Sequence, residues 1–312
     1  TISFEMLRDN LKKEFNIDTL NISPKVSLNN TFYYFFRFFD YFFFLSNYLY
    51  KILFIKYHSV YLTISQSSHG FMRDFFFINF SKFLKIKVVI HLKGGNYDNF
   101  FNNQNFLLKK LIKFKLNNSN KIVVLGDKLK YMFDFDNKLK SKIIIINNCL
   151  TSTHNDFIKK KIDPKEFKIL FLSNLIVTKG YLDTLKALSI LKNDGFNFKA
   201  FFCGKFLIKE SNYKNEVDQS RDFFDRIKNY NLENHVTYID NISGQKKIDK
   251  LIESDFFILP TNYIHEGQPV SIIEALAYKN IVITTKYKSI PDLIQNNKNG
   301  FFVDYNSPHQ IY

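Results

Sequence analysis

HEGQPVSIIEALAYKNIVITT, residues 265–285, is the stretch that decides the fold. It follows the apolar run FILP at residues 257–260, which is typical of a buried strand. Glu266 and Gly267 come next and predict a loop, and Pro269 suits a first helical turn because that turn leaves its N–H groups unpaired in any case. We expect the helix to bury an apolar face made of Val270, Ile273, Leu276 and Ala277. Strand, loop, helix and the next strand, IVITT, indicate a parallel α/β unit.

Two carboxylates flank the start of this predicted helix. Glu266 lies in the loop, and Glu274 follows eight residues later. A helix N-terminus attracts anions through its unpaired N–H groups and its dipole. This arrangement could bind a diphosphate at the helix N-terminus while both carboxylates accept hydrogen bonds from sugar hydroxyls. An acidic helix start that the dipole favours is the alternative.

The same alternation of short β-branched runs and helical stretches extends through the chain and predicts two parallel sheets. We expect strands at residues 19–22, 59–64, 87–92, 121–125, 142–146, 167–173, 198–203, 236–239, 256–259 and 281–285. We expect helices at residues 4–15, 31–56, 70–84, 105–117, 127–135, 181–193, 218–230, 245–253, 269–279 and 291–295. The polar, aperiodic stretch between the halves predicts one domain at residues 1–150, a linker at 151–166 and a second domain at 167–312. Such sheets bind ligands in the cleft at their strand carboxyl ends.

Basic residues concentrate in the first half. Residues 1–150 hold 22 Lys and Arg against 10 Asp and Glu, a net charge of +12 out of +15 for the chain. This favours an anionic partner such as phosphates, nucleic acid or an acidic membrane face, although lysines solvated on ordinary helices explain it equally well. Because no nucleic-acid-binding module is recognisable, we expect no nucleic-acid partner.

The aromatic stretch at residues 31–57 predicts a helix that is either buried or in contact with a membrane. Its longest uncharged run is ten residues, 41–50, whereas a spanning helix needs about 20 apolar residues. Cys149 and Cys203 both adjoin apolar runs, which predicts buried free thiols in a reducing compartment. The sequence has no cluster of Cys and His, so we expect no metal site.

The segment at residues 265–285 resembles glycosyltransferase family 4, the retaining group with the GT-B fold of two Rossmann-like domains facing a central cleft. The family hallmark is E-G-x-P-x-x-x-x-E-A-x-A, and this chain reads E-G-Q-P-V-S-I-I-E-A-L-A from Glu266. The resemblance implies that Glu266 contacts the transferred sugar and Glu274 the ribose. It also places Gly267, Gln268, Pro269 and Val270 at the donor.

Further segments match the family in order. FLSNLIVTKGYLDTLKAL at residues 171–188 contains the Lys179-Gly180 pair that resembles the family's phosphate-binding lysine. Relatives carry an Arg five positions earlier; here the residue is Asn174, which brings no charge and weakens the clamp. We expect Asn174 and Gly204, in FCGK at residues 202–205, to contact the donor nonetheless.

VVIHLKGGNYDNF at residues 88–100 resembles the family's strand that ends in a histidine near glycines. The resemblance implies that His91 lies near the donor sugar, while a structural histidine at a strand end is the alternative. Gly94 and Gly95 would let the backbone approach a ligand closely. With Glu266 and Lys179, His91 completes the predicted catalytic set.

The family opens with a strand and a Gly-rich loop and ends with helices that return to the first domain. This chain begins at what resembles the first helix and stops at residue 312. We therefore expect the first domain to lack its first strand and the second domain to be truncated.

The resemblance implies a retaining transfer from a nucleoside diphosphate sugar to a glycan or lipid-linked acceptor, without a metal or other cofactor, in bacterial cell-surface polysaccharide or lipopolysaccharide synthesis. A sugar-nucleotide epimerase of the same fold and a degenerate, non-catalytic sugar-nucleotide-binding protein remain alternatives. The expected location is the cytoplasm, with peripheral contact to the anionic inner face of the cytoplasmic membrane.

Overall fold

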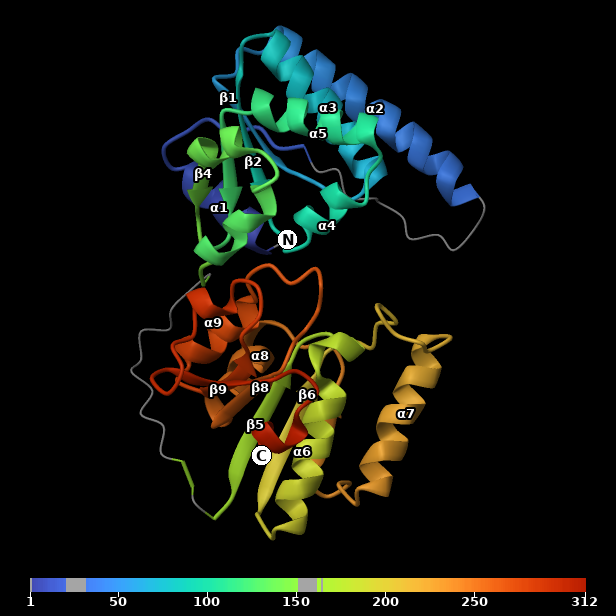
Figure 1. Ribbon diagram of the computed structural model, residues 1–312, viewed down its shortest axis with the longest axis vertical. Coiled ribbons are helices and arrows are strands. Elements are labelled where there is room, and N and C mark those ends of the chain that lie inside the picture. Colours follow the sequence, from blue (N-terminus) through green and yellow to red (C-terminus); the bar gives the residue numbers. More distant parts are fainter. Residues whose placement is uncertain (1, 21–31, 151–161, 164) are drawn as a thin grey trace. The chain divides into compact units, whose positions relative to one another are not determined.

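A computed structural model describes residues 2–20, 32–150, 162–163 and 165–312, with the backbone alone at residues 2–6 and 32–41 (Figure 1). The chain forms two compact units, Thr1–His91 with Gln104–Val123, and Leu92–Asn103 with Val124–Tyr312. Residues 21–22 of the strand predicted at 19–22, and residues 151–161 and 164 of the predicted linker, lie outside the described residues. The predicted domain boundaries stay a prediction.

The first sheet has four strands in the order β1-β2-β3-β4. Their bounds are β1 Ser59–Thr63, β2 Lys87–Leu92, β3 Lys121–Val124 and β4 Ile143–Ile145. β1 and β2 pair in parallel, with Ser59 beside Lys87 and Thr63 beside His91. Val and Ile fill all the buried positions of β3 and two of the four in β2, where His91 and Leu92 are the others, a composition expected for strands covered by helices.

The helices of the first unit are α1 Ile2–Leu11, α2 Phe32–Phe54, α3 Ser68–Phe83 and α5 Phe106–Asn118. The Ser67 hydroxyl caps α3 by accepting from the Gly70 N–H, and the Asn105 side chain caps α5 by accepting from the Leu108 N–H. α2 packs on α3 through Tyr48, Ile52 and Phe77. No helix among the described residues is long and apolar enough to cross a membrane.

The second sheet has six strands in the order β10-β9-β8-β5-β6-β7, and its five neighbouring pairs are all parallel. Their bounds are β5 Phe167–Leu172, β6 Phe198–Cys203, β7 Val236–Ile239, β8 Phe256–Leu259, β9 Ile281–Thr285 and β10 Gly300–Val303. Counted along the chain, this is the Rossmann order 3-2-1-4-5-6. The strand order reverses between β5 and β8, where such sheets bind ligands.

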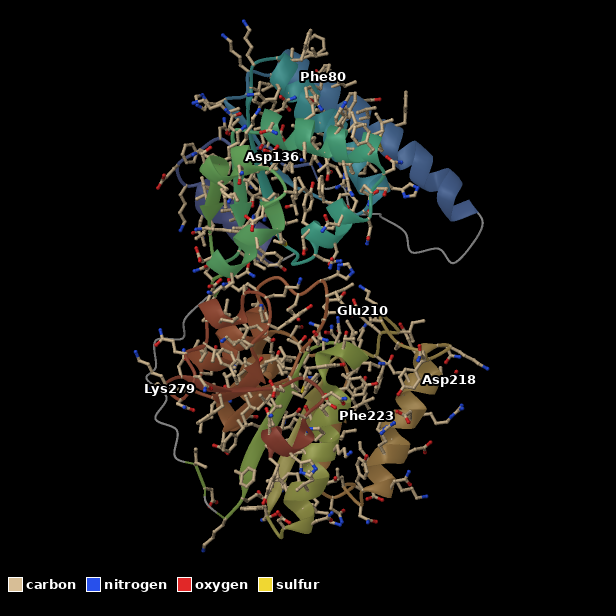
Figure 2. The ribbon with its side chains drawn as sticks, in the orientation of Figure 1. Phe80, Asp136, Glu210, Asp218, Phe223 and Lys279 are labelled. Carbon is tan, nitrogen blue, oxygen red and sulfur yellow. The ribbon has the colours of Figure 1, made fainter. Side chains whose placement is uncertain are left out.

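The helices of the second unit are α4 Tyr97–Asn102, α6 Tyr181–Asn193, α7 Glu216–Asn229, α8 Gly244–Glu253, α9 Val270–Ala277 and α10 Pro308–Ile311. α6 and α7 lie on one side of the second sheet, and α8 and α9 lie on the other (Figure 1). Phe223 of α7 is fully buried and meets the rings of Tyr181, Phe202 and Phe206 (Figure 2). This aromatic cluster ties α6 and α7 to β6.

Five sequence predictions are wrong in detail. The helices predicted at 127–135 and 291–295 are short 3₁₀ segments, Asp127–Phe133 and Ile290–Asp292, and β10 was not predicted as a strand. The buried residues of α9, which packs on β8 and β9, are Ile272 and Ala275, whereas Val270 and Ala277 of the predicted apolar face are exposed. Cys149 is exposed because β4 ends four residues earlier, whereas Cys203 is buried.

Candidate functional site

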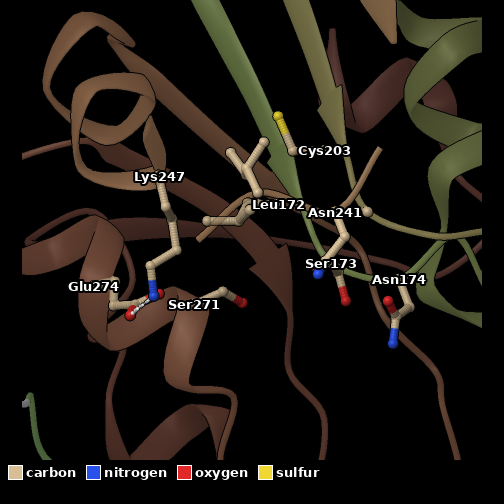
Figure 3. A pocket seen from close by; sticks show the side chains of 10 residues that line it. Leu172, Ser173, Asn174, Cys203, Asn241, Lys247, Ser271 and Glu274 are labelled. Atoms are coloured by element: carbon tan, nitrogen blue, oxygen red, sulfur yellow. Dashed lines mark hydrogen bonds and ion pairs between the residues drawn. The ribbon is translucent and has the colours of Figure 1, made fainter. Parts of the chain in front are cut away.

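A pocket of about 210 Å³ lies at the carboxyl ends of β5 and β6 (Figure 3). Its walls come from the segments that follow β5, β6 and β7 and from the starts of α8 and α9. The lining residues are Leu172, Ser173, Asn174, Cys203, Gly204, Asn241, Ile242, Lys247, Ser271 and Glu274. The pocket therefore occupies the place where the Rossmann topology predicts a ligand.

Gly204 allows the two strand ends to come together at the pocket. Its φ of +147° is rarely adopted by other residues, and a Cβ there would lie 2.1 Å from the Ser173 carbonyl oxygen. Burial raises the pKa of the neighbouring Cys203 thiol to about 12. The thiol therefore stays protonated at neutral pH and forms a passive part of the wall.

An ion pair crosses one end of the pocket. Lys247 Nζ lies 2.5 Å from Glu274 Oε1, and their side chains are 23% and 15% exposed. Lys247 comes from α8 and Glu274 from α9, so the packing of these two helices brings the charges together (Figure 3). The pair supplies both a donor and an acceptor next to the apolar side chains of Leu172 and Ile242.

A second ion pair lies in the loops after β5 and β8. Lys179 Nζ is 3.3 Å from Glu266 Oε2, which also accepts a hydrogen bond of 3.4 Å from the Thr261 hydroxyl. Lys179 is 5.3 Å from the centre of the Tyr263 ring. Burial, with a smaller contribution from the carboxylates of Glu210 and Glu266, raises the pKa of Tyr263. The side chains of Lys179 and Glu266 are themselves largely buried, so little water screens this pair and its charge interaction is strong.

The loop before α9 is held by backbone and amide contacts. Gln268 is buried, its side-chain oxygen accepts from the Asn148 N–H at 2.7 Å, and its carbonyl accepts from the Asn148 amide at 2.9 Å. The Ser289 hydroxyl donates to the Gly267 carbonyl at 2.6 Å. A Cβ on Gly267 would lie 2.1 Å from the Lys93 carbonyl oxygen. The glycine and the glutamine therefore serve local packing of this loop.

Gly95, in the segment after β2, makes a similarly close contact with the loop before α9. A Cβ on Gly95 would lie 1.8 Å from the Glu266 carbonyl oxygen, and its N–H donates to the His265 carbonyl at 3.3 Å. The close approach predicted for the Gly94-Gly95 pair is therefore made, at Gly95, to the chain itself.

The predicted site residues separate into three groups. Asn174, Gly204 and Glu274 line the pocket, and Lys179 with Glu266 forms the second ion pair. Four residues of the loop and helix start are outside the pocket lining: Gly267, Gln268, Pro269 and Val270. The roles assigned to all of them stay predictions.

His91, the last predicted member, lies in β2 of the first unit. It is buried, its Nδ1 shares a hydrogen bond with the Tyr61 hydroxyl, and the two rings meet edge to face. Burial raises the pKa of Tyr61. The catalytic role of His91 stays a prediction. Among the described residues, no group of three or more His, Cys, Asp or Glu side chains could hold a metal ion.

Sequence reasoning missed most of the pocket wall. Ser173 is the last residue of the strand predicted at 167–173, and Asn241 comes two residues after the strand predicted at 236–239, so the rule that ligands bind at strand carboxyl ends could have found them. Lys247 carries no such signal, because its partner lies 27 residues away on another helix.

Comparison with known proteins places these features in one family. The pattern of the glycosyl transferases group 1 family matches residues 152–312, just over half of the chain. No curated protein matches it.

Solved structures show the same architecture at low sequence identity. Anabaena HepE in complex with UDP superposes with a TM-score of 0.64 at 14% identity, over 86% of this chain and 69% of HepE. Sucrose-phosphate synthase from Thermosynechococcus elongatus gives 0.64 at 11% identity, over 94% and 71%. The lipopolysaccharide outer core galactosyltransferase WaaB gives 0.59 at 13%, over 89% and 70%. These likenesses confirm the predicted GT-B fold, and with the family match they establish that the chain belongs to the glycosyl transferases group 1 and is a glycosyltransferase.

Proposed function

We propose that this chain transfers a sugar from a nucleoside diphosphate sugar to a glycan or lipid-linked acceptor, with retention at the anomeric carbon, in bacterial cell-surface polysaccharide synthesis. The observation that carries the proposal is the pocket with Glu274 at the strand ends of the second sheet. Its volume of about 210 Å³ is below the ~300–1,000 Å³ of sites for drug-sized ligands, so it fits a nucleoside better than a whole sugar nucleotide. The bound UDP of Anabaena HepE supports this ligand class.

The loops beside the pocket supply groups for the chemistry. As the bond between the anomeric carbon and the phosphate oxygen breaks, the leaving diphosphate gains negative charge. Lys179 and the N–H groups of Gly267, Gln268 and Val270 stabilise that charge, while Pro269 has no N–H to offer. Glu266, 3.3 Å from Lys179, orients the transferred sugar through its hydroxyls. The missing charge at Asn174 leaves Lys179 as the main cation of this clamp.

The experiment is a donor screen with UDP-, GDP- and ADP-sugars, with and without a lipid or glycan extract as acceptor. We expect nucleoside diphosphate release that depends on the acceptor, and an α-configured product by NMR from an α-linked donor. An epimer formed from donor alone would establish the epimerase instead. Nucleotide binding without either product would support the degenerate, non-catalytic sugar-nucleotide-binding protein, and absence of binding as well would contradict the proposed site.

Glu274→Ala tests the pocket itself. A carboxylate that accepts from ribose hydroxyls contributes about 1.5–3 kcal/mol, so donor affinity should fall roughly 10- to 100-fold. Glu253→Ala is the matched control, because Glu253 also pairs with a lysine but lies outside the pocket. Titration calorimetry measures both variants, and an unchanged affinity in Glu274→Ala would remove this residue from the site.

The proposal also includes an acceptor held at an anionic membrane. α2 and α5 both direct apolar side chains outward at helical spacing. The exposed apolar residues, together called the apolar stripes, are Phe42, Phe43, Tyr50, Leu53 and Phe54 on α2, and Phe106, Leu107 and Phe114 on α5. Since α3 packs on both helices, the stripes belong to one helical layer of the first unit. Large apolar side chains that gather on an exposed surface are typical of sites that bind proteins or membranes.

The charge of the first unit favours an anionic membrane as the partner that covers the apolar stripes. Residues 42–91 and 104–123 carry 11 Lys and Arg and one Asp. Basic side chains near an acidic bilayer contribute about 1 kcal/mol each, and aromatic side chains insert at its interface. Co-sedimentation tests the idea: the protein should pellet with phosphatidylglycerol vesicles and stay in solution with phosphatidylcholine. Equal behaviour with both lipids would contradict it.

A further inference from the structure

The proposed function leaves one charged pocket residue without a role. Lys247 lines the pocket from α8, and its ammonium group contacts Glu274 on α9. Its neighbour Lys246 has the same charge on the same helix but is exposed and outside the pocket. The two lysines therefore share charge and helix but differ in burial, in access to the pocket and in the contact with Glu274.

The pairing answers an electrostatic difficulty of the site. Glu274 is only 15% exposed, and an uncompensated carboxylate there would be costly to desolvate and would repel a nucleoside diphosphate. Lys247 cancels this charge at 2.5 Å. The bond engages Oε1, and because a carboxylate has about four acceptor positions, Glu274 keeps capacity for hydroxyl donors.

The lysine also limits how Glu274 can move. A glutamate side chain has three rotatable bonds, and holding it against α8 removes rotamer freedom before the ligand arrives. The alternative is that Lys247 acts as a remote positive charge in an already basic protein. That alternative gives Lys246 and Lys247 equal effects.

We propose that Lys247 is a positioning residue for nucleoside recognition, which holds and neutralises Glu274 so that its carboxylate is preset for the ribose hydroxyls. This inference rests on the proposed function, since it assumes that the pocket takes a nucleotide. It adds to the donor site a residue that lies outside the motif running from Glu266 to Glu274.

The experiment is a double-mutant cycle with UDP, GDP and ADP as probes for the full chain. The nucleotide that binds wild type best is then titrated into Lys247→Met, Glu274→Gln, the double variant and the control Lys246→Met. We expect Lys247→Met to weaken binding roughly 10-fold or more, since it breaks a charge-assisted hydrogen bond. In the Glu274→Gln background the same change should cost less than about threefold, because no charge remains to be held.

Turnover separates positioning from a structural effect. Lys247→Met should raise the donor KM with little change in kcat, whereas a merely structural effect would reduce the active fraction and lower kcat as well. Lys247→Gln, which keeps a donor without the charge, provides a second variant if the first folds poorly.

Each remaining result has a definite meaning. Equal binding by Lys247→Met and Lys246→Met overturns the inference, and so does a full loss in the Glu274→Gln background, which would mean direct contact with the nucleotide. Failure of wild type to bind any of the three nucleotides counts against the proposed function instead.

Discussion

Lys115 of α5 is fully buried, and its ammonium group has no hydrogen-bond partner among the described residues. It lies 4.4 Å from the centre of the Phe71 ring. Burial lowers the pKa of Lys115 to about 8, with Asp74 opposing this shift and Arg73 adding to it. The folded first unit therefore bears the cost of a poorly solvated charge at neutral pH.

We predict that Lys115→Met stabilises the protein at pH 7. The drop in pKa from 10.5 to about 8 corresponds to about 3 kcal/mol of unfolding free energy, an upper bound for the gain. Urea unfolding of the full chain measures it, with Lys110→Met, an exposed position on α5, as control. A Met variant less stable than wild type would show that the ammonium group is better compensated than its contacts indicate.

The same lysine sets a pH dependence. Its folded pKa is below its unfolded value, so between about pH 8 and 10.5 the unfolded chain binds more protons. The Lys115 contribution to the unfolding free energy should therefore rise with pH across this window and be at its most unfavourable below pH 8. Lys115→Met should lose this rise, and a wild type whose curve matches that of the variant would contradict the assignment.

Lys179 is the residue where catalysis and binding can be told apart. We predict that Lys179→Ala lowers kcat roughly 10- to 100-fold and changes donor affinity less, because it acts on charge that develops as the bond breaks. Lys168→Ala is the control, since Lys168 also pairs with a glutamate, Glu253, at a distance of 3.7 Å, and this pair lies away from the site. If only the donor KM rises, Lys179 binds the ground state and takes no part in the chemistry.

At the scale of elements, sequence pattern predicted what depends on local composition. The strands predicted at 198–203, 236–239, 256–259 and 281–285 match β6 to β9, because dense apolar runs between polar loops have few other conformations. β10 was missed because GFFV is short and follows an Asn-Gly pair that reads as a turn. The motif also placed Glu266 and Glu274 on either side of a helix start.

What depends on tertiary packing could not be predicted. Gln268 sits inside the motif, yet its amide bonds to Asn148, 120 residues earlier. Val270 belongs to an apolar pattern but is exposed, because the packing of α9 buries Ile272 and Ala275 instead. The assignment to glycosyltransferase family 4 within group 1 likewise stays a prediction.

The α5 part of the apolar stripes yields a prediction at the same scale. Phe106, Leu107 and Phe114 are exposed, so changing all three to Ser should leave the core intact. We expect the triple variant to lose most of its binding to phosphatidylglycerol vesicles and to keep its nucleotide affinity. Val217→Ser is the control, because Val217 is an exposed apolar residue on α7 of the second unit. Retained vesicle binding would confine membrane contact to α2 or to charge alone.

For the whole molecule, charge divides unevenly between the halves. Residues 1–150 carry +12, and residues 151–312 carry +3 from 22 basic and 19 acidic side chains. Surface charges act over a screening length of about 10 Å in 0.1 M salt and about 3 Å in 1 M salt. Partly buried pairs such as Lys247 with Glu274 are screened much less. The two proposed binding activities should therefore respond differently to salt.

We predict that raising NaCl from 0.1 to 1 M releases the protein from phosphatidylglycerol vesicles while its affinity for UDP falls only a few-fold. If three lysines each contribute about 1 kcal/mol at the bilayer, their loss weakens vesicle binding roughly 100-fold. Co-sedimentation and calorimetry at the same salt concentrations provide the comparison. Vesicle binding that survives 1 M salt would mean that the apolar stripes hold the protein without help from its charge, and parallel losses of both activities would mean that nucleotide recognition also depends on the long-range field.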